Sequence, residues 1–183
     1  MTIAENWIEE VMRFWFDELS PQDWFLRNEV VDQQCRKRFL ALYEVLSARA
    51  SSAPPSTARH ALATVIVLDQ FPRNLFRGSP RAFATDAIAL SLAEQAIAAG
   101  FDKALSAEQR LFLYMPFQHA EDRSIQAQSI ALFESVGNVQ SLGYAMRHKE
   151  VIDRFGRFPH RNTALGRDST AEELEFMKHH GGF

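Results

Sequence analysis

The sequence predicts an all-α protein of about eight helices, and three observations support that fold class. Apolar residues recur at the three- and four-residue spacing of a helix along almost the whole chain. Residues that favour helix ends stand at the boundaries of these segments. No segment shows the strict alternation of a half-buried strand. Because 183 residues suit one compact domain, we expect a single domain over residues 1–183.

Two amphipathic helices are expected before a proline-rich loop. Residues 3–17 repeat apolar side chains at helical spacing, and this segment stops near Ser20 and Pro21. A longer helix follows over residues 28–49, with basic residues opposite its apolar side. Prolines within residues 51–56 exclude a continuing helix, so this stretch is expected to be a loop.

The third helix is expected to be the most buried. It begins at Thr57, whose hydroxyl can cap it, and it runs through Asp69. Residues 61–68 are apolar on every side, which suits the centre of a helical protein. The β-branched residues in this run also suit a buried strand. The absence of strand patterns around it favours the helix.

Five more helices are expected in the second half, each with a capping residue or a closing glycine. Ser106 with Gln109, and Thr170 with Glu173, have the spacing of capping boxes. Short connections favour antiparallel neighbours, so we expect helix hairpins stacked in an irregular α–α superhelix or a compact bundle. The expected segments are Thr85 or Asp86 to Ala99, Ser106 to about Ala120, Asp122 or Ser124 to Gly137, 139–155, and Thr170 to the glycines at 181–182.

Composition and charge exclude several classes of function. A net charge of −3 argues against a nucleic acid or an anionic membrane as the partner. No apolar run approaches the roughly 20 residues that span a bilayer, and the first residues lack the pattern of a secretory signal. The single cysteine, Cys35, cannot form an intramolecular disulfide, and we expect a cytoplasmic protein.

Signatures of known enzymes and cofactor sites are missing from the sequence. No pair of histidine and carboxylate residues has the i, i+4 spacing of a zinc site together with a second cluster that would complete the site. The sequence also has no glycine-rich phosphate loop, no Gly-x-Ser-x-Gly turn and no dinucleotide fingerprint. We therefore expect neither a metal nor a cofactor.

Two segments carry nearly the same side chains and are the main candidates for a functional site. Asp69–Gly78 and Asp153–Asn162 each place an acid, an aromatic residue, a proline, arginines and an asparagine at an expected helix end. Seven of the sixteen arginines fall within residues 69–86 and 153–168. Guanidinium groups bind carboxylate and phosphate through paired hydrogen bonds. The candidate ligand-binding residues are Arg73, Asn74, Arg77, Arg157, Arg161 and Asn162.

The order of the helices predicts that these two segments meet. If the helices that end near Asp69, Ala120 and Phe155 alternate with antiparallel neighbours, their C-terminal ends point the same way. The segment Met115–Asp122, with His119, would then lie between the two arginine-rich segments. Cations at helix C-termini also stabilise the helix dipole, so arginines paired with aspartates can serve structure alone.

Three functions are compatible with the edge of the molecule where these segments are expected to meet. The first is a binding module for a small anionic ligand or an acidic peptide. The second is a hydrolase-like enzyme for an anionic substrate, with His119 or His160 as general acid/base and Asp69 or Asp153 orienting it. Histidines at helical spacing, including His119, also fit plain core positions. The third is a structural scaffold, in which exposed aromatic residues dock a partner or a second copy in a homo-oligomer.

Five stretches of the chain are similar to one known family: Val11–Phe16, Trp24–Phe25, Val67–Asp86, Arg110–Asp122 and Arg154–Asn162. With these motifs the sequence resembles the bacterial family known as domain of unknown function 924. The resemblance covers essentially the whole chain. It implies an all-helical, tetratricopeptide-like fold, and it brings no established activity or catalytic residues.

Overall fold

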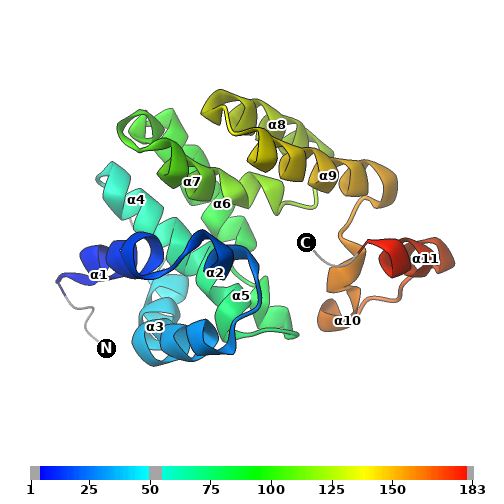
Figure 1. Ribbon diagram of the computed structural model, residues 1–183, viewed down its shortest axis with the longest axis horizontal. Coiled ribbons are helices and arrows are strands. Elements are labelled where there is room, and N and C mark those ends of the chain that lie inside the picture. The colour runs from blue at the N-terminus through cyan, green and yellow to red at the C-terminus, as the bar shows by residue number, and fades with distance from the viewer. Residues whose placement is uncertain (1–4, 50–54, 181–183) are drawn as a thin grey trace.

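The computed structural model describes residues 5–49 and 55–180, and every regular element within these ranges is a helix (Figure 1). The all-α class is therefore confirmed. The α-helices of the first half are α1 (Trp7–Arg13), α2 (Pro21–Phe25), α3 (Glu29–Arg49), α4 (Ala58–Val65), α5 (Phe71–Leu75) and α6 (Asp86–Ala98). Those of the second half are α7 (Ala107–Gln118), α8 (Arg123–Val136), α9 (Val139–Phe155), α10 (Asn162–Leu165) and α11 (Ala171–His179).

Shorter helical segments join or extend several of these elements. Two are π-helical: η1 (Phe14–Glu18) continues α1, and η2 (Ile66–Gln70) continues α4. Three are 3₁₀ turns, namely η3 (Pro80–Ala82), η4 (Phe101–Ala104) and η5 (Pro159–Arg161). A π-helical hydrogen bond spans five residues instead of the four of an α-helix, which alters where the side chains point, and such segments recur at functional sites.

The helix boundaries follow the capping residues closely. Thr57 accepts a hydrogen bond from the backbone N–H of His60 at the start of α4. The capping box of Ser106 and Gln109 is present in α7, and the box of Thr170 is present in α11. Asp122 accepts from two backbone N–H groups at the start of α8. Each cap satisfies donors that the first helical turn leaves unpaired.

Two prolines mark differences from the sequence-based expectation. Pro21 begins a short helix, α2, because proline suits the first turn, where its missing N–H has no helical partner. Pro72 likewise lies in the first turn of α5, so the helical path continues beyond Asp69. The expected start at residue 3 and most of the loop at 51–56 lie outside the described residues.

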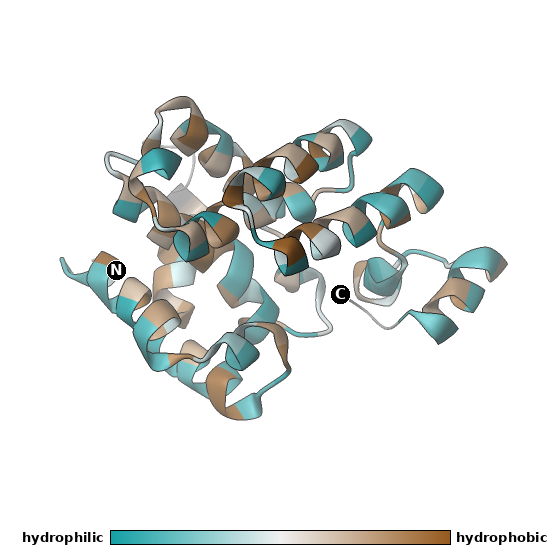
Figure 2. Cartoon of the chain, turned by 45° about the horizontal axis from the view of Figure 1, so that its top comes forward, coloured by the Kyte–Doolittle hydropathy of each residue, from teal (hydrophilic) through white to brown (hydrophobic). Residues whose placement is uncertain are grey.

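The buried helix α4 with η2 forms the centre of the molecule. α4 packs against α1, α6 and α7, and α3 packs against α5 and η2. Every residue from Ala61 to Gln70 is buried. Figure 2 shows hydrophobic residues where helices face one another and hydrophilic residues on outward faces. Within the described residues, no helix is long and apolar enough to cross a membrane.

The second half adds a layer of antiparallel helices and a small C-terminal group. α7, α8 and α9 pack in sequence against one another (Figure 1, top). After α9 the chain turns at Gly156, which has a φ of 70°, and continues into η5, α10 and α11. A separate apolar cluster of Val151, Ile152 and Phe158 joins this group to α9. The turn brings the second arginine-rich segment back toward α5 and α6.

Candidate functional site

A cavity of about 820 Å³ is lined by residues from both halves of the chain. Its walls come from α2, α5, the end of α7, α9 and the C-terminal group. Cavities of roughly 300–1,000 Å³ are the size that holds small ligands. Among the described residues that line it, Glu150 is the one acid. The basic lining residues are Arg73, Arg77, Arg147, Arg161, His119, His148, His160 and His180.

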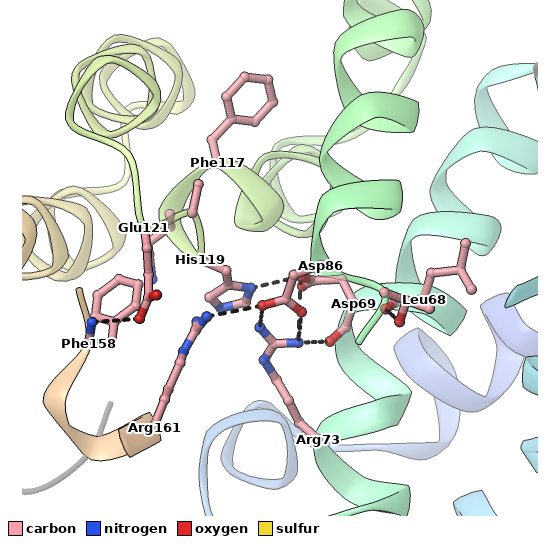
Figure 3. A network of polar contacts seen from close by, with 12 residues as sticks. Leu68, Asp69, Arg73, Asp86, Phe117, His119, Glu121, Phe158 and Arg161 are labelled. Carbon is pink, nitrogen blue, oxygen red and sulfur yellow. Dashed lines mark hydrogen bonds and ion pairs between the residues drawn. The ribbon is translucent and has the colours of Figure 1, made fainter. Parts of the chain in front are cut away.

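An aspartate and a histidine form a hydrogen-bonded pair in the wall of this cavity (Figure 3). Asp69 lies in η2 and is fully buried, and its Oδ1 is 2.9 Å from Nδ1 of His119 at the end of α7. Nε2 of Gln70 donates to the other carboxylate oxygen. The π-helical turn thus places two consecutive buried polar residues beside the end of α7.

The charges around this pair fix its protonation state. Burial alone would raise the pKa of Asp69, but His119 and Arg73 outweigh it and hold that pKa well below its usual value. Burial lowers the pKa of His119, and Arg73 lowers it further, against the opposing effect of Asp69. At neutral pH the carboxyl group is therefore ionised and the imidazole is neutral. Nδ1 carries the imidazole proton and donates it to Asp69.

Two arginines from distant segments share one carboxylate next to this pair. Nη1 and Nη2 of Arg73 donate to the two oxygens of Asp86, each at 3.0 Å. Nη1 of Arg161 donates to Oδ2 of Asp86 at 3.2 Å. Arg73 also donates to the backbone carbonyl of Asp69. One aspartate at the start of α6 thus connects α5 to η5, as Figure 3 shows.

Arg161 is held between two aromatic rings. Its guanidinium carbon lies 4.7 Å from the centroid of Phe83 and 4.5 Å from that of Phe158. Its Nε is buried and has no hydrogen-bond partner among the described residues. Burial, and then the charge of Arg73, lower the pKa of Arg161 to about 10. The side chain is still charged at neutral pH, although one of its buried donors is unsatisfied.

The remaining arginines of the cavity are oriented in a similar way. Arg77 pairs with Asp32 of α3 through two hydrogen bonds, and Asn74 donates to the same carboxylate at 2.8 Å. Arg147 lies over the ring of Tyr144, 4.3 Å from its centroid. The paired carboxylates Asp32, Asp69 and Asp86 are not among the lining residues. Arginines therefore line the cavity, whereas the carboxylates that pair with them do not.

Two further histidines lie in the cavity wall and are neutral at physiological pH. His148 is hydrogen-bonded through Nδ1 to the carbonyl of Tyr144 at 2.8 Å, and burial lowers its pKa to about 3. Burial, and then the charge of Arg161, lower the pKa of His160 to about 4. The ring centroids of His119 and His148 are 6.3 Å apart. No group of histidine, cysteine and acidic residues within the described ranges is arranged to hold a metal.

A second ion pair fixes the returning chain. Glu121 accepts from the backbone N–H of Phe158 at 2.7 Å and from Arg167 at 2.6 and 2.9 Å. Arg167 also donates to the side chain of Asn162 at 3.0 Å. These contacts hold η5, and with it Arg161, against the connection between α7 and α8. The three segments that helix order predicted to meet do lie together.

Comparison with known proteins is consistent with this architecture. A family model described as bacterial protein of unknown function, DUF924, matches residues 11–181. The chain belongs to the DUF924 family. A solved structure of a protein of unknown function from Agrobacterium tumefaciens is similar to it, with a TM-score of 0.88 and 36% sequence identity. The similarity covers 94% of this chain and 97% of the other. The comparison with curated proteins found no match.

The structure of this DUF924 protein separates the sequence-predicted residues into two groups. Four of the six candidate ligand-binding residues line the cavity, and so do both candidate histidines. Asp69 does not line it and is hydrogen-bonded to one of these histidines, His119. The cavity-lining candidates are Arg73, Asn74, Arg77, Arg161, His119 and His160.

The other three candidates of the DUF924 protein do not line the cavity. Asp153 is paired with Lys149 on the same helix. Arg157 donates to Glu173 at 2.7 and 2.9 Å, and Asn162 donates to the same carboxylate at 3.3 Å. Glu173 is the capping-box residue of α11, so these contacts fix the C-terminal helix. The near-repetition in sequence therefore does not produce equivalent placements.

Several residues of the site were missed in the sequence. Asp86 is not among the candidate residues, although it stands in the same arginine-rich segment. Gln70 and Gln118 are buried polar residues within apolar runs, a pattern that was available in the sequence. Cys35 is not a candidate nucleophile, because burial raises the pKa of its thiol strongly.

Proposed function

We propose that this DUF924 protein binds a small organic anion in the cavity, with the negative group of the ligand facing Arg73 and Arg161. One observation carries the proposal: Arg73 and Arg161 line the cavity, whereas the carboxylate that pairs with both does not. Such an arrangement presents positive charge in a region of reduced solvent, where electrostatic attraction is stronger than in bulk water.

The hydrogen bonding of Arg161 supports an anionic ligand. Nη1 is bonded to Asp86, and the rings of Phe83 and Phe158 lie near its guanidinium. The edge with Nε and Nη2 is the one that binds carboxylate or phosphate through two parallel hydrogen bonds. Since Nε is buried without a partner among the described residues, a ligand oxygen would satisfy it.

The rest of the lining suits a small, mostly neutral ligand body. Aromatic side chains of Trp24, Phe83 and Tyr144 form part of the wall. Gln70 and Gln118 offer neutral hydrogen bonds near the histidines. An apolar lining with a few convergent polar groups is typical of small-molecule sites. The expected ligand has one carboxylate or phosphate group on a compact organic body.

Thermal-shift measurements with a panel of anions test the proposal. The panel contains inorganic phosphate, succinate, benzoate, and N-acetyl-trialanine with its C-terminal amide as the neutral comparison. A ligand at 100 times its Kd adds about 2.7 kcal/mol to the free energy of unfolding. For a chain of this length that corresponds to a rise of roughly 5–11 °C in Tm. A shift with N-acetyl-trialanine but not with its amide would identify a peptide carboxylate as the bound group.

A pair of arginine variants makes the test specific for the cavity. Arg161→Gln removes the charge at the site, whereas Arg154→Gln removes one that pairs with exposed Glu172 outside the cavity. We expect the anion-induced shift to be lost in Arg161→Gln and retained in Arg154→Gln. If no anion stabilises the wild-type protein, or if both variants respond equally, the proposal is wrong.

A further inference from the structure

The Asp69–His119 pair has the geometry of an oriented general base. Asp69 is fully buried and its Oδ1 is 2.9 Å from Nδ1 of His119, so the carboxylate fixes both the ring and its tautomer. Gln70 holds the second carboxylate oxygen, and Arg73 holds the backbone carbonyl of Asp69. The carboxylate therefore has little freedom to turn away from the imidazole. A neutral imidazole with its proton on Nδ1 carries a lone pair on Nε2.

The second nitrogen of His119 is available to a ligand. His119 lines the cavity, and within the described residues no side chain or backbone group is hydrogen-bonded to its Nε2. A nitrogen in this state accepts a proton from a group that lies within about 3 Å of it. No described hydroxyl or thiol is hydrogen-bonded to His119 either, and Cys35 is buried in the core. The group that it can deprotonate is a water molecule or a hydroxyl of the ligand.

Positive charge lies next to this base. Arg73 contacts both Asp69 and Asp86, and Arg161 contacts Asp86, so the base and the two guanidinium groups belong to one connected network (Figure 3). A fixed cation beside a proton acceptor stabilises negative charge that develops when water attacks a carbonyl carbon. These are the parts that hydrolysis of an ester by general-base catalysis requires.

We infer that His119 is the general base in the hydrolysis of a carboxylic ester carried by a small organic anion, with Asp69 as its positioning residue. This inference rests on the proposed anion site. Water attacks the carbonyl carbon while Nε2 of His119 takes one of its protons. The tetrahedral intermediate then expels the alcohol oxygen, and the proton on Nε2 passes to that leaving group. One water is consumed, and one acid and one alcohol are formed.

The test uses the mono-p-nitrophenyl ester of succinic acid as substrate and succinate as the binding probe. Wild-type protein, His119→Gln, Asp69→Asn and the control Arg154→Gln are compared for turnover and, by calorimetry, for succinate binding. We expect His119→Gln to lower kcat by about 10²–10⁴-fold and to bind succinate within about threefold of wild type. Arg154→Gln should match wild type in both measurements.

The positioning role of Asp69 has its own signature. Nitrogen NMR of the histidine side chains should show the Nδ1–H tautomer for His119 in wild type and a shift toward Nε2–H in Asp69→Asn, together with a lower kcat. The kcat of wild type should rise with pH through one ionisation below pH 6.5 and then stay level, because the neutral imidazole is the active form. If His119 has the same tautomer in wild type and in Asp69→Asn, or if the kcat of wild type does not vary with pH, this role is contradicted.

The outcomes separate the inference from the proposed function. If the wild-type protein binds succinate but hydrolyses the ester no faster than buffer or His119→Gln, the catalytic inference is overturned and the anion site stands. The comparison of wild-type protein with buffer needs no variant, so it tests the inference even if a variant fails to fold. If no anion of the panel binds, the proposed function is overturned and the inference is overturned with it.

Discussion

Replacing Asp86 with asparagine is the most direct perturbation of the arginine cluster. Asp86 receives two hydrogen bonds of 3.0 Å from Arg73 and one of 3.2 Å from Arg161. The side chains are 17%, 21% and 7% exposed, respectively, so water compensates little for a lost charge. Asparagine keeps the size of the side chain and removes its charge. The variant therefore leaves two buried cations short of an anion without opening a void.

The magnitude follows from the contacts that remain. Removing one partner of a buried ion pair costs about 3–5 kcal/mol. Arg73 keeps the carboxylate of Asp69, whose Oδ1 is 3.6 Å away, so the lower end of that range is expected. A loss of about 3 kcal/mol lowers Tm by roughly 6–12 °C in a chain of this size. Arg161, which loses its hydrogen-bonded carboxylate, accounts for most of the loss.

Calorimetric melting of Asp86→Asn against a matched surface variant checks this prediction. Glu9→Gln removes the partner of Arg59 in an ion pair whose side chains are 67% and 49% exposed. Exposed pairs contribute about 0–1 kcal/mol, so its Tm should change little. Equal losses in the two variants, or an unchanged Tm in Asp86→Asn, would refute the view that one buried carboxylate compensates both arginines.

Three further predictions follow from other buried groups. The free energy of unfolding should fall as pH drops from about 6.5 to about 3, because burial lowers the pKa of His148 to about 3 and of His160 to about 4. In this range the unfolded chain therefore binds more protons than the folded one. Urea titrations at pH 7.5 and 4.5 measure the fall, and His148→Gln should reduce it. Glu173→Gln weakens two hydrogen bonds from Arg157 and should cost about 1.5–3 kcal/mol, with faster amide exchange in α11 than in α7; uniform exchange in both helices would contradict it. The thiol of Cys35 should react with a disulfide reagent only in denaturant, since it is buried and its pKa is raised; labelling of the native protein would show otherwise.

Local chemistry along the chain determined the helices and most of their ends. The box of Ser106 and Gln109 begins α7, and Thr57 begins α4, because a cap involves residues only three positions apart. The same reasoning found the buried helix through its continuous apolar run. It missed α2 and the continuation through Pro72, because a proline in a first turn resembles a helix breaker in sequence.

Helix order was sufficient to predict that the aromatic and arginine-rich turns meet, but it could not predict which of their side chains form hydrogen bonds with one another. Arg157 and Arg161 stand four positions apart, yet one pairs with Glu173 in α11 and the other with Asp86, which is 75 residues away. Asp69 and His119 are 50 residues apart and meet because η2 packs against α7. Which residues form ion pairs over such distances along the chain depends on which charged side chains are brought together and removed from water when the helices pack. Only the packed helices determine that, whereas the sequence alone determined the helices, their caps and the edge on which the arginines gather.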